Sequence, residues 1–268
     1  MYHLKQIPSD TEIRKFLRRI LFGKNIFCPK CKSWNVVVYE ARYRCRNKKC
    51  RLKFSLLSHT WLSNLKLPLQ EFWLILWCFV KQMPVKQTEE LTELSEKAVR
   101  HHFDLFRAHL PNSQEMLEHI IQLDEAYFGK FSGWALLMGK QVGTRKLAYE
   151  LLFSDAPGRI DAINFLKSHV KPDTALNTDA SVIYQGIENH FPVNHTWDTH
   201  KKFEFKNTSE IEGMFGVLRT FIRRMYHHTS KEKFPEYMLE FYIRFSRPEM
   251  FESPCHYLLN TLSIVPTG

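Results

Sequence analysis

Ile120-Ile121-Gln122-Leu123-Asp124-Glu125 is an apolar run that ends in two acids. This pattern is typical of a buried strand that presents a carboxylate at its edge. A second run, Thr174-Ala175-Leu176-Asn177-Thr178-Asp179, also has strand character and also ends in an acid. In residues 210–226 apolar side chains recur at helical spacing, which predicts a helix that begins with Glu210 and Glu212. Two acids at strand ends and one on a later helix can converge on one point.

Asp124, Asp179 and Glu212 are the predicted catalytic residues and magnesium ligands. Carboxylates at close range repel one another, so such a cluster is stable mainly when divalent cations neutralise it. Mg²⁺ is the hard, oxygen-binding candidate, with Mn²⁺ as an alternative. Two ions about 3.5 to 4 Å apart can activate an oxygen nucleophile and stabilise charge during phosphodiester cleavage. We expect Asp124 to bridge the two ions, Asp179 to hold one and Glu212 the other.

A simpler interpretation exists for each acid taken singly. An Asp that follows a strand is more often a turn or helix cap than a metal ligand. Asp179 precedes Ala180-Ser181 and fits such a cap, and Glu125 fits a solvated neighbour of Asp124.

The composition favours a nucleic-acid partner. The chain has 268 residues, a formal net charge of +10 and 44% hydrophobic residues, which suffices for a sizeable core. Strong positive charge favours a polyanion such as double-stranded DNA, the alternative being a basic protein with no special partner. The longest apolar run, residues 72–80, is too short for a bilayer, which takes about 20. No membrane contact is therefore predicted. Residues 1–19 are polar and charged, which predicts no export signal. Both a bacterial cytoplasm and a eukaryotic nucleus are compatible with an intracellular protein.

Four cysteines have the spacing of a zinc site. Cys28, Cys31, Cys45 and Cys50 form the pattern C-x2-C-x13-C-x4-C. Each pair can direct two thiolates at one ion, and four thiolates around Zn²⁺ make a closed structural site. Val36-Val37-Val38-Tyr39 and Tyr43-Arg44 predict the hairpin of a zinc ribbon. The alternative, unligated core cysteines, is disfavoured because so short a polar segment does not fold without an ion.

The same segment concentrates positive charge without any acid between residues 42 and 53. Its seven cations are Arg42, Arg44, Arg46, Lys48, Lys49, Arg51 and Lys53. Part of this charge offsets the thiolates, but seven cations exceed that need. Salt-dependent contact with DNA phosphates is predicted.

The chain divides into five predicted parts. They are an N-terminal helix (1–22), the zinc ribbon (23–58), a helical region (59–112), a catalytic domain (118–250) and a C-terminal tail (251–268). Residues 87–94 and 96–109 resemble a helix-turn-helix, whose second helix would carry Lys97 and Arg100 toward a groove. The fold class is therefore multidomain, α+β or α/β. The elements expected after residue 118 are three strands, a helix, a strand and two helices, the second-last of them at residues 181–191. That order is expected of a ribonuclease-H-like domain.

Several motifs together resemble one family. Leu123-Asp124-Glu125-Ala126-Tyr127-Phe128-Gly129, Asn177-Thr178-Asp179, Ile211-Glu212-Gly213-Met214-Phe215-Gly216-Val217-Leu218-Arg219 and Tyr226-His227-His228 occur in this order. They resemble the DDE transposases of insertion sequences with an amino-terminal zinc ribbon, the ISXO2-like group, which is related to the eukaryotic Merlin transposases. The resemblance covers residues 28–245.

The resemblance implies a cut-and-paste DNA transposase. Such an enzyme binds terminal inverted repeats, cleaves phosphodiester bonds, transfers the 3′-hydroxyl ends to target DNA, and is expected to act as a homodimer. Asp124, Asp179 and Glu212 match the three catalytic acids. Many relatives have asparagine where this chain has Ser209 and lysine where it has Arg219, and Glu210 stays open as the third acid.

Further basic residues extend the predicted DNA-binding surface along the last helices, and two other functions stay open. Arg219 shares a helix face with Glu212 and can hold a phosphate, and Arg223 and Arg224 continue the basic surface. One alternative is a domesticated, non-catalytic DNA-binding regulator that uses the zinc ribbon. The other is a related nuclease that cuts without strand transfer.

Overall fold

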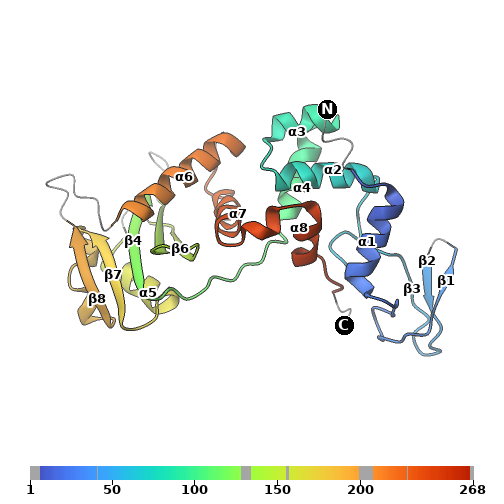
Figure 1. Ribbon diagram of the computed structural model, residues 1–268, viewed down its shortest axis with the longest axis horizontal. Coiled ribbons are helices and arrows are strands. Elements are labelled where there is room, and N and C mark those ends of the chain that lie inside the picture. The colour runs from blue at the N-terminus through green and yellow to red at the C-terminus, as the bar shows by residue number, and fades with distance from the viewer. Residues whose placement is uncertain are drawn as a thin grey trace. The chain divides into compact units, whose positions relative to one another are not determined.

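The computed structural model describes residues 7–40, 42–127, 134–154, 157–198, 208–227 and 229–265. The motif residues Phe128, Gly129 and His228 lie outside this set. The chain forms two compact units, each described here by itself (Figure 1). Unit 1 comprises residues 1–109 and 249–268, and unit 2 comprises residues 110–248.

Unit 1 begins with helix α1 (Asp10–Phe22) and a small sheet. Ser9 and Glu12 form a reciprocal capping box that starts α1, and Ile13 and Leu17 are fully buried. The sheet has the order β1 (Val36–Tyr39), β2 (Arg42–Cys45) and β3 (Lys53–Phe54), all antiparallel. The predicted hairpin is thus present, and a third short strand joins it.

The remainder of unit 1 is helical and packs around aromatic side chains. Its helices are α2 (Leu69–Val80), α3 (Val85–Thr92), α4 (Glu96–Arg107) and α8 (Pro254–Thr261). Phe79 contacts Phe103, Phe106 and Tyr257, and the Tyr257 hydroxyl donates to the Phe106 carbonyl across 2.6 Å. Residues 251–268, expected as a tail, therefore include a helix that packs into this core.

Unit 2 is built on a mixed five-stranded sheet with the order β6-β5-β4-β7-β8. The strands are β4 (Ile120–Tyr127), β5 (Ala135–Gln141), β6 (Leu147–Leu152), β7 (Thr174–Asp179) and β8 (Val193–Asp198). The helices are α5 (Arg159–His169), α6 (Ser209–Tyr226) and α7 (Phe234–Ser246). Strands β4, β5 and β6 pair antiparallel, whereas β7 pairs parallel with both β4 and β8.

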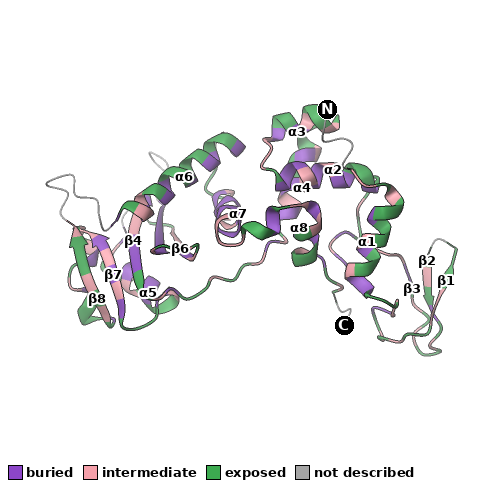
Figure 2. Cartoon of the chain, in the orientation of Figure 1, coloured by how far each residue is buried: buried purple, intermediate pink, exposed green. Residues whose placement is uncertain are grey.

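Helices cover both faces of this sheet (Figure 1). On one face, Leu123 and Leu176 pack with Phe165 and Leu166 of α5 in a buried core. The α5 helix lies so close that a Cβ added at Gly139 would come within 2.9 Å of the Phe165 ring. Helix α6 contacts β4 and β5, and it alternates buried and exposed residues as an amphipathic helix should (Figure 2). Because strand side chains alternate between faces, Asp124 lies on the face opposite to Leu123.

Two expectations for unit 2 were wrong. Residues 181–191, predicted as a helix, form two short 3₁₀ turns, η2 (Val182–Tyr184) and η3 (Ile187–Asn189). Gly186 between them adopts φ +70°, a left-handed conformation that ends the first turn. The following strand, β8, was not predicted. None of the helices among the described residues has the length and apolar character that spanning a membrane requires.

Candidate active site

Asp124 and Asp179 lie side by side because β4 and β7 are parallel neighbours. Gln122 of β4 pairs with Asn177 of β7, and each acid follows two residues later on its strand. Carboxylate oxygens of Asp124, Asp179 and Glu125 all lie within 4.8 Å of one another. The structure thus brings together the two acids predicted at the strand ends. The backbone N–H of Ser181 also donates to the Asp179 carboxylate across 3.0 Å, so Asp179 closes a turn as well.

Glu125 is the member of this cluster that the sequence analysis missed. It was interpreted as a solvated neighbour, but the Tyr184 hydroxyl donates to its carboxylate across 2.5 Å and the Ser181 hydroxyl lies 3.4 Å away. Burial, followed by the charge of Asp179, raises the pKa of Glu125 despite these donors. In the sequence only its position next to Asp124 pointed to Glu125, and its contacts with Tyr184 and Ser181 depend on the fold.

The carboxylates of this cluster repel one another when they are charged. Burial raises the pKa of Asp124 to about 7, and the charges of Glu125, Asp179 and Glu212 add to that shift. A nearby cation lowers the pKa of such a carboxyl group and so favours its charged form. Three acids that offer oxygen atoms at this spacing fit hard divalent ions such as Mg²⁺.

Glu212 lies in the first turn of α6, outside the 4.8 Å group but within electrostatic range of Asp124. Its carboxylate accepts a hydrogen bond from the Thr208 hydroxyl at 3.1 Å. Glu210, the alternative third acid, has other partners. It forms an ion pair with Lys140 and accepts the Gly143 N–H at 3.1 Å, and Lys140 holds the pKa of Glu210 below its usual value.

The four predicted zinc ligands also converge. The Sγ atoms of Cys28 and Cys50 are 3.6 Å apart, as are those of Cys31 and Cys45, and all four lie within 4.8 Å of one another. Four sulfurs bound to one Zn²⁺ at about 2.3 Å stand about 3.8 Å apart, so the cluster fits zinc and is too wide for disulfides. Burial raises the pKa of Cys45 to about 12, whereas the Ser33 backbone N–H lowers that of Cys31 to about 7.

Comparison with known proteins identifies part of unit 2. Residues 158–246 match the family model described as ISXO2-like transposase domain. This third of the chain is similar to an ISXO2-like transposase domain. The matched segment includes Asp179, Glu212 and the whole of α6, while Asp124 and the four cysteines precede it.

The chain also has structural similarity to solved proteins of low sequence identity. One solved structure that it resembles is the cryoEM structure of the simian T-cell lymphotropic virus intasome in complex with the PP2A regulatory subunit B56 gamma. The match has 13% sequence identity and a TM-score of 0.36, and it covers 59% of this chain and 67% of that chain. No curated protein matches the chain.

In the matched segment, the basic residues of α6 are open to solvent. Arg219, Arg223 and Arg224 are all exposed. Arg219 and Arg223 follow Glu212 at intervals of seven and eleven residues, so the three side chains share one helix face. Basic side chains therefore extend along the helix from its acidic end.

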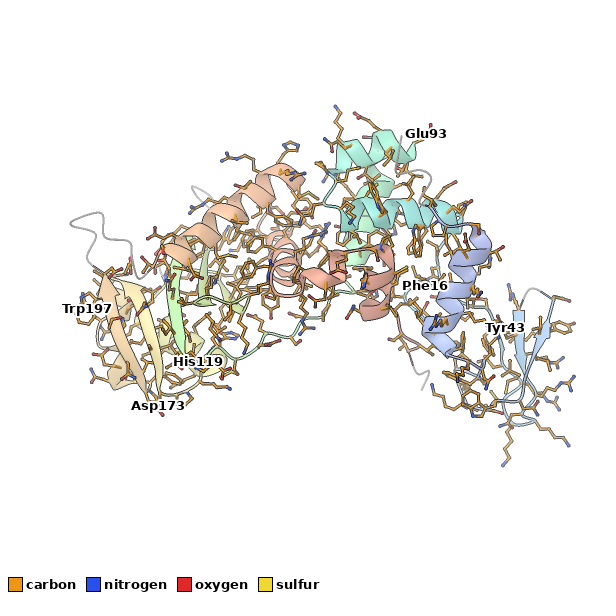
Figure 3. All side chains as sticks on the ribbon, in the orientation of Figure 1. Phe16, Tyr43, Glu93, His119, Asp173 and Trp197 are labelled. Atoms are coloured by element: carbon orange, nitrogen blue, oxygen red, sulfur yellow. The ribbon has the colours of Figure 1, made fainter. Side chains whose placement is uncertain are left out.

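The predicted DNA-binding residues of unit 1 are exposed too. All seven cations between Arg42 and Lys53 are exposed, and two of them, Arg44 and Lys53, lie over the ring of Tyr39. Tyr43, labelled in Figure 3, marks the small sheet that carries them. On α4, Lys97 and Arg100 are exposed, and Arg100 pairs with Glu96 at 2.7 Å.

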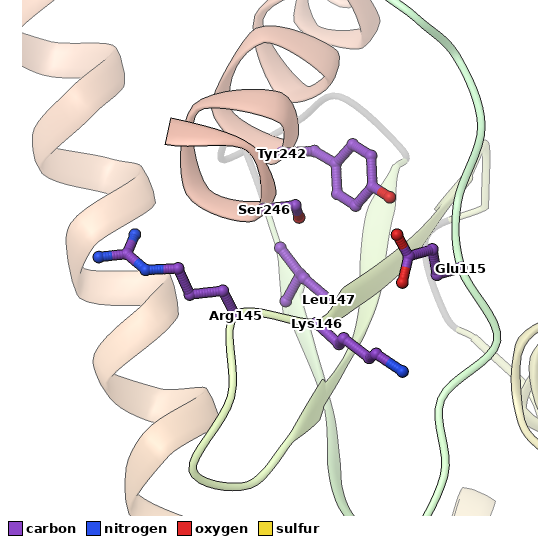
Figure 4. Close-up of a pocket in the computed structure, with 6 residues that line it drawn as sticks. All are labelled: Glu115, Arg145, Lys146, Leu147, Tyr242 and Ser246. Carbon is purple, nitrogen blue, oxygen red and sulfur yellow. The ribbon is translucent and has the colours of Figure 1, made fainter. Parts of the chain in front are cut away.

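A cavity of about 100 Å³ in unit 2 is separate from the cluster of Asp124, Glu125 and Asp179 (Figure 4). The residues that line it are Glu115, Arg145, Lys146, Leu147, Tyr242 and Ser246. The Lys146 ammonium group pairs with Glu118 at 3.2 Å, and Arg145 donates to the Phe245 carbonyl at 3.3 Å. Asp124, Glu125 and Asp179 do not line this cavity.

Proposed function

We propose that this protein is a DNA transposase that cuts the ends of a mobile element and joins them to target DNA. The observation that carries the proposal is the cluster of carboxylates from the second half of β4 and the end of β7, together with the match of residues 158–246 to the ISXO2-like transposase domain. The mixed sheet with helices on both faces is compatible with the ribonuclease-H-like fold expected for this domain.

Asp124, Asp179 and Glu212 are the proposed catalytic acids. When bound, two Mg²⁺ or Mn²⁺ ions would activate the oxygen nucleophile and stabilise charge on the attacking and leaving oxygens. Asp124 and Asp179 offer carboxylates from neighbouring strands, and Glu212 offers a third from α6. Glu125 adds negative charge and is held by Tyr184, so it strengthens the attraction of the site for cations.

The basic surfaces would bring double-stranded DNA to these acids. Phosphate contacts supply most of the affinity of such proteins and make it depend on salt. The exposed cations of residues 42–53 suit contact with terminal inverted repeats, and Lys97 and Arg100 on α4 suit a groove contact. Arg219, Arg223 and Arg224 would hold phosphates beside the acids. The four cysteines would hold one structural Zn²⁺ that keeps the first of these surfaces folded.

A homodimer is proposed because two DNA ends must be cut and joined together. DNA is the substrate, so the protein is expected to work where DNA is, in a bacterial nucleoid or a eukaryotic nucleus.

The test uses the genomic DNA that flanks the coding sequence on both sides, because a mobile element carries its ends there. The purified protein is incubated with this labelled DNA, a supercoiled target plasmid and Mg²⁺. The expected products are cuts at both ends and labelled DNA joined to the plasmid. Cuts without joined product would indicate a nuclease, and binding without cuts would indicate a DNA-binding regulator.

A further inference from the structure

Gln122 connects the strand that carries Asp124 to the helix that carries Glu212. The Ile211 backbone N–H donates to the Gln122 side-chain oxygen across 2.9 Å. Both residues are buried. Gln122 precedes Asp124 by two residues and so shares its face of the sheet, and Ile211 directly precedes Glu212. The N–H groups in the first turn of a helix have no partner within the helix, so this bond satisfies one of them.

Lys140 makes a second connection at the same level of the sheet. It lies on β5 directly opposite Gln122, and its ammonium group pairs with Glu210 of α6. The same group donates to the carbonyls of Thr144 at 3.0 Å and Gln141 at 3.3 Å, so all three of its protons have acceptors. The Gly143 N–H donates to Glu210 from the turn after β5.

These polar contacts set the position of α6 along the sheet more narrowly than apolar packing does. The buried residues of α6, such as Met214, Phe215 and Leu218, hold the helix on the sheet without fixing how far it slides along it. Burying Gln122 and Lys140 costs free energy unless their hydrogen bonds form. Because those bonds are directional, they form only when the first turn of α6 stands at one position over β4 and β5.

We infer that Gln122, Lys140 and Glu210 form a clamp that sets the position of α6 and thereby holds Glu212 toward Asp124. This inference rests on the proposed function of those two acids. It makes Gln122, Lys140 and Glu210 positioning residues, and it assigns Glu210 to the clamp and not to the third catalytic position.

The test compares substitutions that break the clamp with one that keeps an acceptor oxygen at the same place. Glu210→Ala and Lys140→Met remove the ion pair. Glu210→Gln removes the charge but keeps the side-chain length and one acceptor oxygen, and one carboxylate oxygen of Glu210 already lies within reach of both Lys140 and the Gly143 N–H. The full-length variants are assayed for Mn²⁺-dependent nicking of a supercoiled plasmid that carries the flanking genomic DNA. Their melting temperatures are also measured with and without Mn²⁺ and without DNA. Glu118→Ala is the matched control, because Glu118 pairs with Lys146 and Lys171 in the same unit.

Glu210→Ala and Lys140→Met should lower kcat at least about tenfold with an unchanged KM for DNA, because small displacements of reacting groups are costly. They should also lose most of the rise in melting temperature that Mn²⁺ produces. Glu210→Gln should keep both properties within about threefold. Glu118→Ala should lower the melting temperature itself but keep the wild-type kcat and the wild-type rise with Mn²⁺, since losing this ion pair moves no catalytic group.

Two results would overturn the inference. If Glu210→Gln is as inactive as Asp124→Asn, Glu210 is itself a metal ligand. If Glu210→Ala and Lys140→Met keep the wild-type rate and Mn²⁺ response, the contacts do not position Glu212. Should either variant fail to fold, Gln122→Met, which removes the acceptor at similar volume, is compared with Gln122→Glu, which retains it. Glu212→Gln is assayed in parallel, because full activity of that variant would refute the proposed third acid whatever the clamp variants do.

Discussion

Tyr184 and Glu125 are joined by a 2.5 Å hydrogen bond that links the turn after β7 to the end of β4. Tyr184 is fully buried, and its hydroxyl donates to a carboxylate that burial and the charge of Asp179 make harder to ionise. The bond therefore stabilises Glu125 in its charged form inside the acidic cluster.

Replacing Tyr184 with Phe should destabilise the protein. The substitution keeps the ring but removes the donor, and a hydrogen bond to a charged group contributes about 1.5–3 kcal/mol. Urea denaturation at pH 8 without divalent ions measures the free energy of unfolding. Tyr127→Phe is the control, since Tyr127 is largely exposed and its change should stay within about 0.5 kcal/mol. Equal losses for the two variants would show that the Tyr184 bond has no special role.

The meeting of Asp124 and Asp179 was predictable because both acids end runs of strand character. Parallel pairing of β4 with β7 then places the two acids at the same level of the sheet, although β4 continues for three residues beyond Asp124. The cysteine spacing likewise predicted a cluster that forms. In both cases each part of the site, a strand that carries an acid or a closely spaced pair of cysteines, can be recognised from neighbouring residues alone. The fold then brings the two parts together.

The missed features depend on tertiary contacts. Period-two alternation places Asp124 and Glu125 on opposite faces, so nothing local indicates that Tyr184 and Ser181 hold Glu125 in the cluster. Strand β8 was not predicted because it contains no continuous apolar run. It is an edge strand, and its residues, including Trp197 (Figure 3), are partly or fully exposed. The partners of Glu210 lie on β5 and in the turn after it, far away in the sequence.

Asp124→Asn should raise the stability of the metal-free protein at neutral pH. Because the folded-state pKa of Asp124 is raised to about 7 from 3.8, the folded state retains a proton that the unfolded state loses, and stability falls as pH rises from about 4 to 7. We expect the variant to be more stable by about 1–3 kcal/mol at pH 8 and equal to the wild type below pH about 4. Denaturation curves at both pH values in EDTA provide the measurement. A variant less stable than the wild type at pH 8 would contradict the predicted repulsion.

The cysteine cluster should hold one zinc ion per chain. Elemental analysis of protein purified without chelator should find this zinc, and Cys45→Ser should abolish it because Cys45 is one of four converging thiols. Loss of zinc should also lower the melting temperature of unit 1, because metal binding and folding are coupled in small cysteine sites. Cys255→Ser is the control, since Cys255 lies on α8 and outside the cluster. Zinc retained by Cys45→Ser would remove this residue from the site.

Glu118→Gln should lower stability at pH 7 but much less at pH 3. Lys171, and then Lys146, hold the pKa of Glu118 down to about 2. A lowered carboxyl pKa contributes stability above the unfolded-state value of about 4.5, and this contribution is lost as pH falls from 4.5 toward 2. Thermal melts of both proteins at the two pH values, in low salt, measure the difference. A difference that is the same at pH 3 and pH 7 would show that the ion pairs contribute nothing.

The central claim is that carboxylates from β4 and β7 form one catalytic site. Its most direct test is Mg²⁺-dependent cleavage of end-containing DNA by Asp124→Asn and Asp179→Asn, with DNA binding measured on the same preparations. We expect cleavage to fall to background in each variant while DNA affinity stays within about threefold of the wild type, because basic surfaces supply that affinity. Wild-type cleavage by either variant would remove its residue from the site and contradict the account.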